Sequence, residues 1–187
     1  MSKAIPPTSI LVVDNFLSDP FTDYEIDKII SLRDAKSRNW YNWLSKEAIP
    51  NFSSKVATIY HNAISYVGLD ESEIVGVETW ANQLELGDFF HMHSDIDEVP
   101  YIRTRRMRSA ILGLVYFADC KDLQGGNIIF DDGVYVGART NRCVLFFGGT
   151  PHAIDRVEAG TRKSLVMSIW DEVPLGYRKE STELKHT

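Results

Sequence analysis

Two apolar runs flank a turn-rich segment in Cys143-Val-Leu-Phe-Phe-Gly-Gly-Thr-Pro-His152-Ala-Ile-Asp-Arg-Val-Glu-Ala-Gly-Thr-Arg162-Lys-Ser164-Leu-Val-Met-Ser-Ile-Trp170. Similar short runs, separated by Gly- and Asp-rich turns, precede it: Val75–Leu86, Ser109–Phe117, Asn127–Phe130 and Val134–Val136. Asp131-Asp132-Gly133, between the last two runs, is a hairpin turn signal. Many short strands of this kind indicate an all-β sandwich or barrel, so we expect a jelly-roll core over residues 74–172.

The first 73 residues have a different pattern, in which helices follow one strand. Residues 9–16 read as a short apolar strand, and apolar residues then recur at helical spacing over residues 24–33 and 53–67. Three aromatic residues lie between these helices: Trp40, Tyr41 and Trp43. We expect their rings to pack in the core or in a lid, because aromatic side chains dominate core burial. The predicted fold class is therefore mainly β with N-terminal helices (α+β).

Length and composition exclude several classes of protein. The 187 residues fit one domain, and 44% hydrophobic and 25% charged residues are typical of soluble globular proteins. A formal net charge of -6 argues against a nucleic-acid surface. No apolar run approaches the roughly 20 residues of a membrane helix and no secretory signal is recognisable, so a cytoplasmic location is expected. Cys120 and Cys143 match no disulfide or zinc spacing, and residues 175–187 read as a polar tail.

A candidate metal site is formed by His93-Ser-Asp95 and a later histidine. In an extended chain, side chains two residues apart point to the same side, so His93 and Asp95 can converge on one ion. The third ligand must come from another strand, and His152 is expected at a strand start after the turn Gly148–Pro151. Two imidazoles and one carboxylate on one face of a metal are the ligand set of non-heme Fe(II) oxygenases.

A candidate anion site lies ten residues beyond His152. Arg162 and Ser164 are again two residues apart, on the strand that leads to Trp170. The guanidinium of Arg162 can hold a carboxylate in a bidentate pair, with the Ser164 hydroxyl as a further donor. The two sites together predict a metal and a carboxylate ligand in one pocket.

Residues from about Gln83 to Trp170 resemble a 2-oxoglutarate- and Fe(II)-dependent oxygenase, closest to the prolyl 4-hydroxylase-like branch. The elements that carry the resemblance occur in order: His93-Ser-Asp95, Tyr116, Gly125-Gly126, His152 and Gly160-Thr-Arg162-Lys-Ser164. The ten-residue step from His152 to Arg162 is similar to that of the branch. The two glycines most simply serve a backbone turn.

This resemblance implies a double-stranded β-helix in which His93, Asp95 and His152 bind iron. Arg162 would bind the distal carboxylate of 2-oxoglutarate, assisted by Tyr116 and Ser164. The implied reaction hydroxylates an amino-acid side chain, free or in a peptide or protein, using dioxygen and releasing succinate and carbon dioxide. Ascorbate is a candidate further cofactor. A carboxylate at Asp95 leaves no site for chloride on the metal, which favours hydroxylation over halogenation.

The chain departs from the common pattern of this branch in two places. Many relatives carry an aromatic residue on the strand before the metal motif, where this chain has Asn82-Gln83, so the surroundings of the cosubstrate are expected to be more polar. An extra histidine, His91, precedes the motif and is an alternative first ligand, a hydrogen-bond donor to one of the ligands or a surface residue.

Two alternatives to the oxygenase remain open. A cupin, also a jelly roll, would use His91, His93, Glu98 and His152, but the Pro-x-Gly pair that normally leads to the last cupin histidine is missing and Arg162 would have no task. A non-catalytic 2-oxoglutarate-binding module would keep the fold and the pocket.

An arginine cluster lies in the segment after the metal motif: Arg103, Arg105, Arg106 and Arg108. Loops often carry function, so we expect the loop from Ile96 to Arg108 to help form the substrate entrance. Its arginines would then favour an acidic substrate or an acidic flanking sequence.

Overall fold

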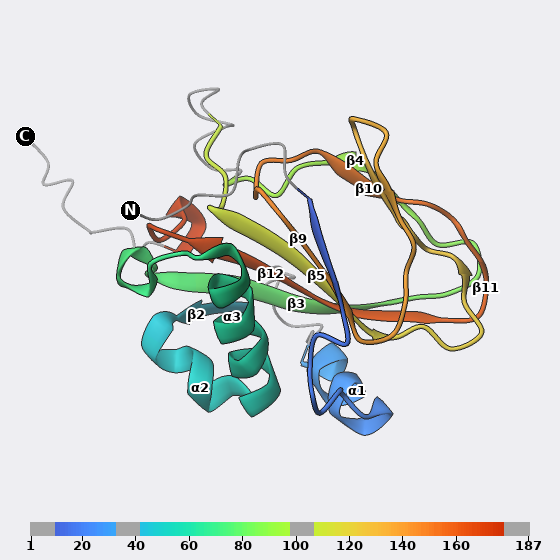
Figure 1. Cartoon of the computed structure of the whole chain (residues 1–187), viewed down its shortest axis with the longest axis horizontal. Helices are drawn as coiled ribbons and strands as arrows, with labels where there is room; N and C mark the ends of the chain where they lie inside the picture. The colour runs from blue at the N-terminus through green and yellow to red at the C-terminus, as the bar shows by residue number, and fades with distance from the viewer. Residues whose placement is uncertain (1–9, 33–41, 98–106, 178–187) are drawn as a thin grey trace, which may run out of the picture.

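A six-stranded antiparallel sheet forms the centre of the molecule in the computed structural model, which describes residues 10–32, 42–97 and 107–177 (Figure 1). Its strands, in spatial order, are β1 (Leu11–Asp14), β9 (Arg142–Phe146), β5 (Leu112–Asp119), β12 (Arg162–Trp170), β3 (Gly76–Leu84) and β2 (Asn42–Ser45). The strand β12 lies between β3 and β5 and pairs with both along most of its length. The backbone of β12, and with it the position of each of its side chains, is therefore fixed by hydrogen bonds on both edges.

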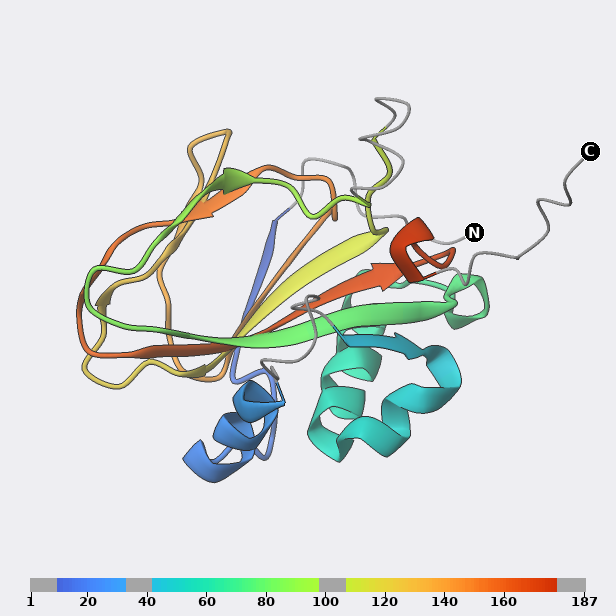
Figure 2. The same ribbon diagram turned by 180° about the vertical axis from the view of Figure 1, so that it is seen from behind.

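A smaller sheet faces the larger one across the interior, as both views show (Figures 1 and 2). Its strands, in order, are β4 (Phe90–His93), β10 (His152–Ile154), β7 (Ile128–Phe130) and β8 (Tyr135–Val136). A short pair, β6 (Gln124–Gly125) and β11 (Val157–Ala159), joins the two layers at one end. This arrangement is a double-stranded β-helix, which confirms the expected jelly roll.

Helices cover the outer face of the larger sheet (Figure 1). They are α1 (Asp23–Ser31), α2 (Ile49–Phe52) and α3 (Ser54–Val67), with short 3-10 turns η1 (Lys46–Ala48), η2 (Glu71–Glu73) and η3 (Leu175–Tyr177). The longest helix begins because the Ser53 hydroxyl accepts a hydrogen bond from the Val56 N–H, and it ends at Gly68, whose φ of 69° closes the last turn. Its buried face packs on the sheet.

The two-residue period of the strands divides the interior into two cores. On β12, the side chains of Leu165, Met167 and Ile169 belong to the core beneath the helices, whereas Val166 belongs to the core between the two sheets. Successive side chains on a strand point to opposite faces, so Arg162 and Ser164 share the inner face with Val166. The alternation alone therefore directs these two polar residues into the space between the sheets.

Several elements differ from what the apolar runs predicted. The strand expected over residues 9–16 is shorter and ends at Asp14, because Asn15 has a φ of 53°. The aromatic stretch contains an additional strand, β2, whose Trp43 ring stacks on Tyr177 at 5.6 Å between centroids. Trp40 and Tyr41 lie outside the described residues. The strands β4, β6 and β11 are short and do not coincide with any of the predicted runs, whereas β10 begins at His152, where a strand start was expected.

The start of the expected polar tail is ordered. Leu175–Tyr177 form η3, and the Leu175 N–H donates to the buried Asp97 carboxylate at 2.7 Å. The remaining residues of that tail, 178–187, lie outside the described part of the chain. In the described residues, none of the helices is long and apolar enough to cross a membrane.

Glu25 joins two of the helices through one carboxylate. Its Oε2 accepts from the Thr22 backbone N–H at 2.8 Å, which completes a capping box at the start of α1, and from Lys55 Nζ of α3 at 2.7 Å. These bonds, that from Lys55 above all, lower the pKa of Glu25 from 4.5 to about 2. A lowered pKa means that the folded state favours the ionised carboxylate.

We expect Glu25→Gln to lower the free energy of unfolding at neutral pH, because the amide loses the charged interaction. The folded-state pKa lies below the unfolded one, so the wild-type advantage is complete above about pH 4.5 and is lost as the pH falls through about 2. Urea unfolding of both proteins between pH 7 and pH 2.5 checks this. Glu73→Gln, at an exposed carboxylate of η2, is the control. A Glu25→Gln deficit that does not shrink with acid would contradict the interpretation.

Candidate metal centre

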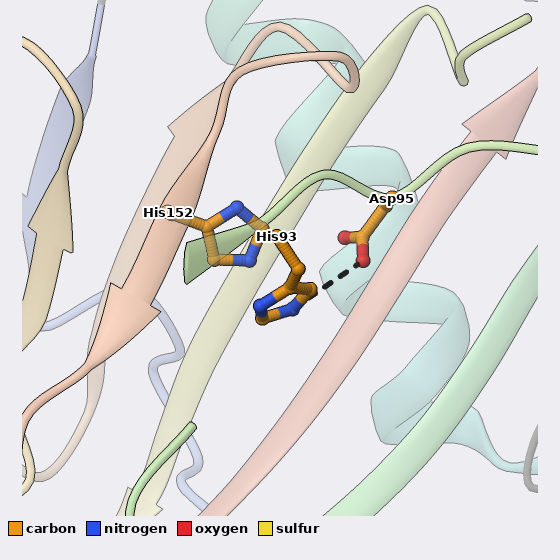
Figure 3. Close-up of side chains that lie close together, drawn as sticks. All are labelled: His93, Asp95 and His152. Carbon is orange, nitrogen blue, oxygen red and sulfur yellow. Dashed lines mark ion pairs between the residues drawn. The ribbon is translucent and has the colours of Figure 1, made fainter. Parts of the chain in front are cut away.

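Two neighbouring strands of the smaller sheet place the metal-motif residues together. His93 is the last residue of β4 and His152 is the first of β10, and the two are direct partners in the antiparallel register. Asp95 follows β4 by two residues and turns its carboxylate toward the same point (Figure 3). One potential ligand atom from each of the three residues lies within 4.8 Å of the others. The expected convergence of His93, Asp95 and His152 is thus present in the structure.

Aromatic packing holds His152 in place. Its ring lies 4.9 Å from Phe146 and 6.2 Å from Phe130, measured between centroids, and the residue is only 4% exposed. His93 lies 4.5 Å from His152 by the same measure but is exposed on its other side. The cluster therefore has one buried wall and one open side, through which a ligand can enter.

Backbone hydrogen bonds orient both imidazole rings. His93 Nδ1 lies 2.7 Å from the carbonyl oxygen of His91, and His152 Nδ1 lies 3.0 Å from that of Thr150. A carbonyl oxygen can only accept, so in each neutral ring Nδ1 carries the proton and Nε2 keeps a free lone pair. This tautomer leaves Nε2 free to bind a metal, and a carbonyl partner on the other nitrogen is the usual outer support of such a ligand.

The Asp95 carboxylate fits a cation. Its Oδ2 is buried and has no hydrogen-bond partner among the described residues, and its Oδ1 is 4.0 Å from His93 Nε2. Burial raises the pKa of Asp95, while the nearby His152 and His93 lower it in part. Burial likewise lowers the pKa of His152, which favours the neutral ring. A buried carboxylate oxygen without a donor, beside two imidazole rings, matches the needs of a divalent metal ion.

The cluster opens into a cavity of about 350 Å³ between the two sheets. Its walls are mainly apolar, formed by Trp80, Phe90, Val115, Ile154 and Val166. Arg162 also lines this cavity. A small-molecule site with apolar walls and a few convergent polar groups has this character, and the volume is at the lower end of such sites, roughly 300–1,000 Å³.

Arg162 is a buried cation that forms no ion pair with any described residue. It is 1% exposed, its Nη1 donates to Ser164 Oγ at 3.0 Å, and its guanidinium lies 4.9 Å from the centroid of the Phe117 ring. Within the described residues no carboxylate comes within ion-pair distance of it, and its buried Nε has no acceptor. Burial lowers the pKa of Arg162 to about 10. An isolated buried charge is costly, so this side chain is suited to an anionic ligand.

The glycine pair makes room for Arg162. Gly125 and Gly126 have φ angles of 71° and 69°, and a Cβ on Gly126 would come within 3.2 Å of Arg162 Cδ. A Cβ on Gly125 would lie 2.0 Å from the backbone oxygen of Arg156, which no side chain can tolerate. The glycines therefore serve the backbone, as expected, and they also leave the space that the Arg162 side chain occupies.

Tyr116 does not assist Arg162. It lies on the opposite face of β5 from Val115 and Phe117, in the core beneath the helices, where its ring packs 5.8 Å from Phe21. Its hydroxyl donates to Asn141 Oδ1 at 3.1 Å. The sequence order placed Tyr116 near the cosubstrate, but the two-residue alternation of the strand points it away. Ser164, in contrast, is buried beside Arg162 as expected, and accepts its hydrogen bond.

His91 contributes its backbone rather than its ring to the cluster. Its carbonyl oxygen is the acceptor for His93, its ring lies edge-on to Phe89 at 4.8 Å between centroids, and the residue is exposed. In the described part of the chain, the group of potential metal ligands includes His93 but not His91. Glu98, which the cupin alternative needs, lies outside the described residues.

Only one arginine of the expected substrate entrance can be placed. Arg108 pairs with Glu172 at 3.0 Å and lies 3.9 Å from Asp171, so acidic residues of this chain already neutralise it. Arg103, Arg105 and Arg106 lie outside the described residues. Trp80 and Val166 also line the cavity, which the sequence analysis did not predict. The two residues are cross-strand partners, and Val166 lies on the same face of β12 as Arg162, so the two-residue alternation of the strands could have identified both.

Comparisons with known proteins identify the fold. No protein-family model and no curated protein matches the sequence. Among solved structures, a prolyl-4-hydroxylase of Pseudomonas putida is similar with a TM-score of 0.54 and 18% identity, over 88% of this chain and 93% of that one. The viral collagen prolyl hydroxylase of Paramecium Bursaria Chlorella virus-1, in complex with 2-oxoglutarate, gives a TM-score of 0.57 and 15% identity, over 86% and 94%.

A third similar structure is an oxidoreductase of the 2-oxoglutarate-Fe(II) oxygenase family from Burkholderia pseudomallei. It has a TM-score of 0.55 and 13% identity, and the match covers 91% of this chain and 89% of that one. At these identities the likeness is one of fold. The resemblance expected from the motifs is therefore confirmed in three dimensions: the chain has the double-stranded β-helix fold of the prolyl 4-hydroxylase-like 2-oxoglutarate/Fe(II) oxygenases.

Proposed function

We propose that the chain is an Fe(II)- and 2-oxoglutarate-dependent dioxygenase that hydroxylates an amino-acid side chain, free or in a peptide or protein. The observation that carries the proposal is a single cavity lined by both the His93, Asp95 and His152 cluster and the buried Arg162 guanidinium. A site that holds a metal and an organic acid side by side matches the needs of this reaction class. The names of the similar solved structures support the same class.

The three residues of the cluster would hold the iron. The Nε2 atoms of His93 and His152 and one oxygen of Asp95 would occupy one face and leave the other positions open to ligands. Bound Fe(II), with dioxygen, would supply the oxidation that converts 2-oxoglutarate to succinate and carbon dioxide and inserts one oxygen atom into a substrate C–H bond. The Asp95 carboxylate would bind the metal where halogenation would need chloride, so hydroxylation is the proposed outcome.

Arg162 and Ser164 would anchor the cosubstrate. The guanidinium has donors to spare, since within the described residues only Ser164 accepts a hydrogen bond from it. A carboxylate can accept two parallel N–H bonds from a guanidinium. The apolar walls around Trp80 and Val166 would exclude water from the bound acid. Ascorbate would act, if it is used, by keeping the iron reduced between turnovers.

The anaerobic protein with Fe(II) and 2-oxoglutarate is expected to show the weak visible charge-transfer band of the chelate, because both ligands must meet in one cavity. His152→Ala should lose the band. In air, a screen of free amino acids and a peptide library is expected to find substrates that stimulate succinate release. Absence of both band and succinate would remove the proposal. A band with 2-oxoglutarate binding but no decarboxylation under oxygen and ascorbate would instead support the non-catalytic binding module.

Measurements of metal affinity distinguish the cupin alternative from the oxygenase. We expect Asp95→Ala to weaken Mn(II) binding by more than the roughly 10- to 100-fold that loss of an outer support costs, because it removes a direct ligand. His91→Ala should change the affinity little, since the backbone carbonyl of residue 91 remains to orient His93. Isothermal titration measures both. The reverse pattern, with metal retained in Asp95→Ala and lost in His91→Ala, would favour the cupin.

Arg162→Met is expected to weaken 2-oxoglutarate binding to the Mn(II)-loaded protein at least about 30-fold, since truncating one partner of a buried charge pair costs about 2 kcal/mol or more. Lys163→Met is the matched control, because Lys163 is the next residue on β12 and pairs with Asp27 of α1, away from the cavity. Mn(II) affinity should be unchanged in both. Equal affinities for 2-oxoglutarate in the two variants would show that Arg162 is not the anchor.

A further inference from the structure

Asn82 occupies a place on β3 where its side chain reaches the cavity. It lies on the same face of the strand as Trp80 and Leu84, which is the inner face, and it lines the cavity. Its direct cross-strand partner on β12 is Ser164, the residue that accepts the hydrogen bond of Arg162. Side chains paired in this way have Cβ atoms about 4.5–5.5 Å apart. The Asn82 amide is therefore a neighbour of the proposed anion anchor.

The Asn82 amide has no partner of its own. The residue is 7% exposed, yet no side-chain hydrogen bond joins it to any other described residue. The polar atoms of its side chain are not completely buried, so the amide reaches the free space of the cavity. Buried polar groups in native proteins are almost always hydrogen-bonded. A group that breaks this rule while facing an open cavity is suited to bind what enters the cavity.

The chemistry of the neighbours indicates which ligand the amide meets. Arg162 can only donate, and the ligand that it selects must carry acceptor oxygens. The Nδ2 of Asn82 is a neutral donor of two hydrogens, and it can bind such an oxygen without adding charge to the cavity. The rest of the wall around it, formed by Trp80, Val115 and Val166, is mainly apolar and leaves the ligand few other partners.

We infer that Asn82 is a further cosubstrate-binding residue, whose Nδ2–H donates a hydrogen bond to an oxygen of the 2-oxo acid that Arg162 holds. The inference rests on the proposed function and adds a residue that lies outside the metal motif. Asn82 acts on binding of the organic acid and leaves the metal ligands untouched, because it belongs to the larger sheet while His93 and His152 belong to the smaller one.

The experiment titrates 2-oxoglutarate into Mn(II)-loaded protein and records heat, so that the readout is binding and not turnover. Asn82→Leu removes the amide at nearly constant volume. A hydrogen bond to a charged group is lost, so the dissociation constant for 2-oxoglutarate is expected to rise about 10- to 100-fold. Asn82→Asp, which has the same shape, should bind more weakly still, because its carboxylate repels the anionic ligand. Mn(II) affinity is expected to stay within about twofold of wild type in both variants.

Gln83→Leu is the matched control, since Gln83 is exposed on the other face of β3 and its amide donates to Glu85. It should bind 2-oxoglutarate as the wild type does. Wild-type affinity in Asn82→Leu or in Asn82→Asp would overturn the inference while leaving the proposed function intact. An unchanged affinity for 2-oxoglutarate with a raised KM for the organic substrate would assign Asn82 to the substrate instead. Wild-type protein that binds Mn(II) but no 2-oxoglutarate would overturn the proposed function, and this inference with it.

Discussion

The pairing of β12 with β3 on one side and β5 on the other is the constraint on which the site depends. It fixes which side chains of β12 face the helices and which face the smaller sheet. A shift of the register by one residue would exchange the two sets, burying Arg162 and Ser164 in the apolar core beneath the helices. The large apolar side chains Leu165, Met167 and Ile169 oppose such a shift because they would leave the core beneath the helices. The packing of this core therefore also determines that the Arg162 side chain points toward the smaller sheet.

The metal cluster depends on a weaker part of the structure. The strands β4 and β10 are short, and β4 is exposed along its length. Two features compensate for this. The direct register of His93 with His152 aligns the backbones, and hydrogen bonds from Nδ1 to nearby carbonyl oxygens fix the rings. The cluster is thus built from local contacts, whereas Arg162 and Ser164 lie on a long strand of the larger sheet.

Sequence patterns predicted the parts of the fold that alternate strongly. The apolar periodicity predicts the long strands β3, β5 and β12 and the helix α3. The two-residue repeat of an extended chain predicts that Asp95 lies on the same side as His93, and Ser164 on the same side as Arg162. The short strand β4 does not follow from apolar periodicity, because it is exposed along its length and pairing with β10, rather than burial, makes it extended. Tyr116 shows the same limit in the site: order along the chain places a residue on a strand, but only the phase of the strand tells which core it enters.

The buried guanidinium has a consequence for the folded state itself. A cation without a counterion raises the free energy of the folded protein, and the unfolded chain, where water surrounds Arg162, does not share this cost. An anion that paired with Arg162 would offset this cost and would bind only the native form, so it would stabilise the fold in proportion to the logarithm of its concentration. The stability of the folded chain would then rise with the concentration of the anion that the proposed site takes.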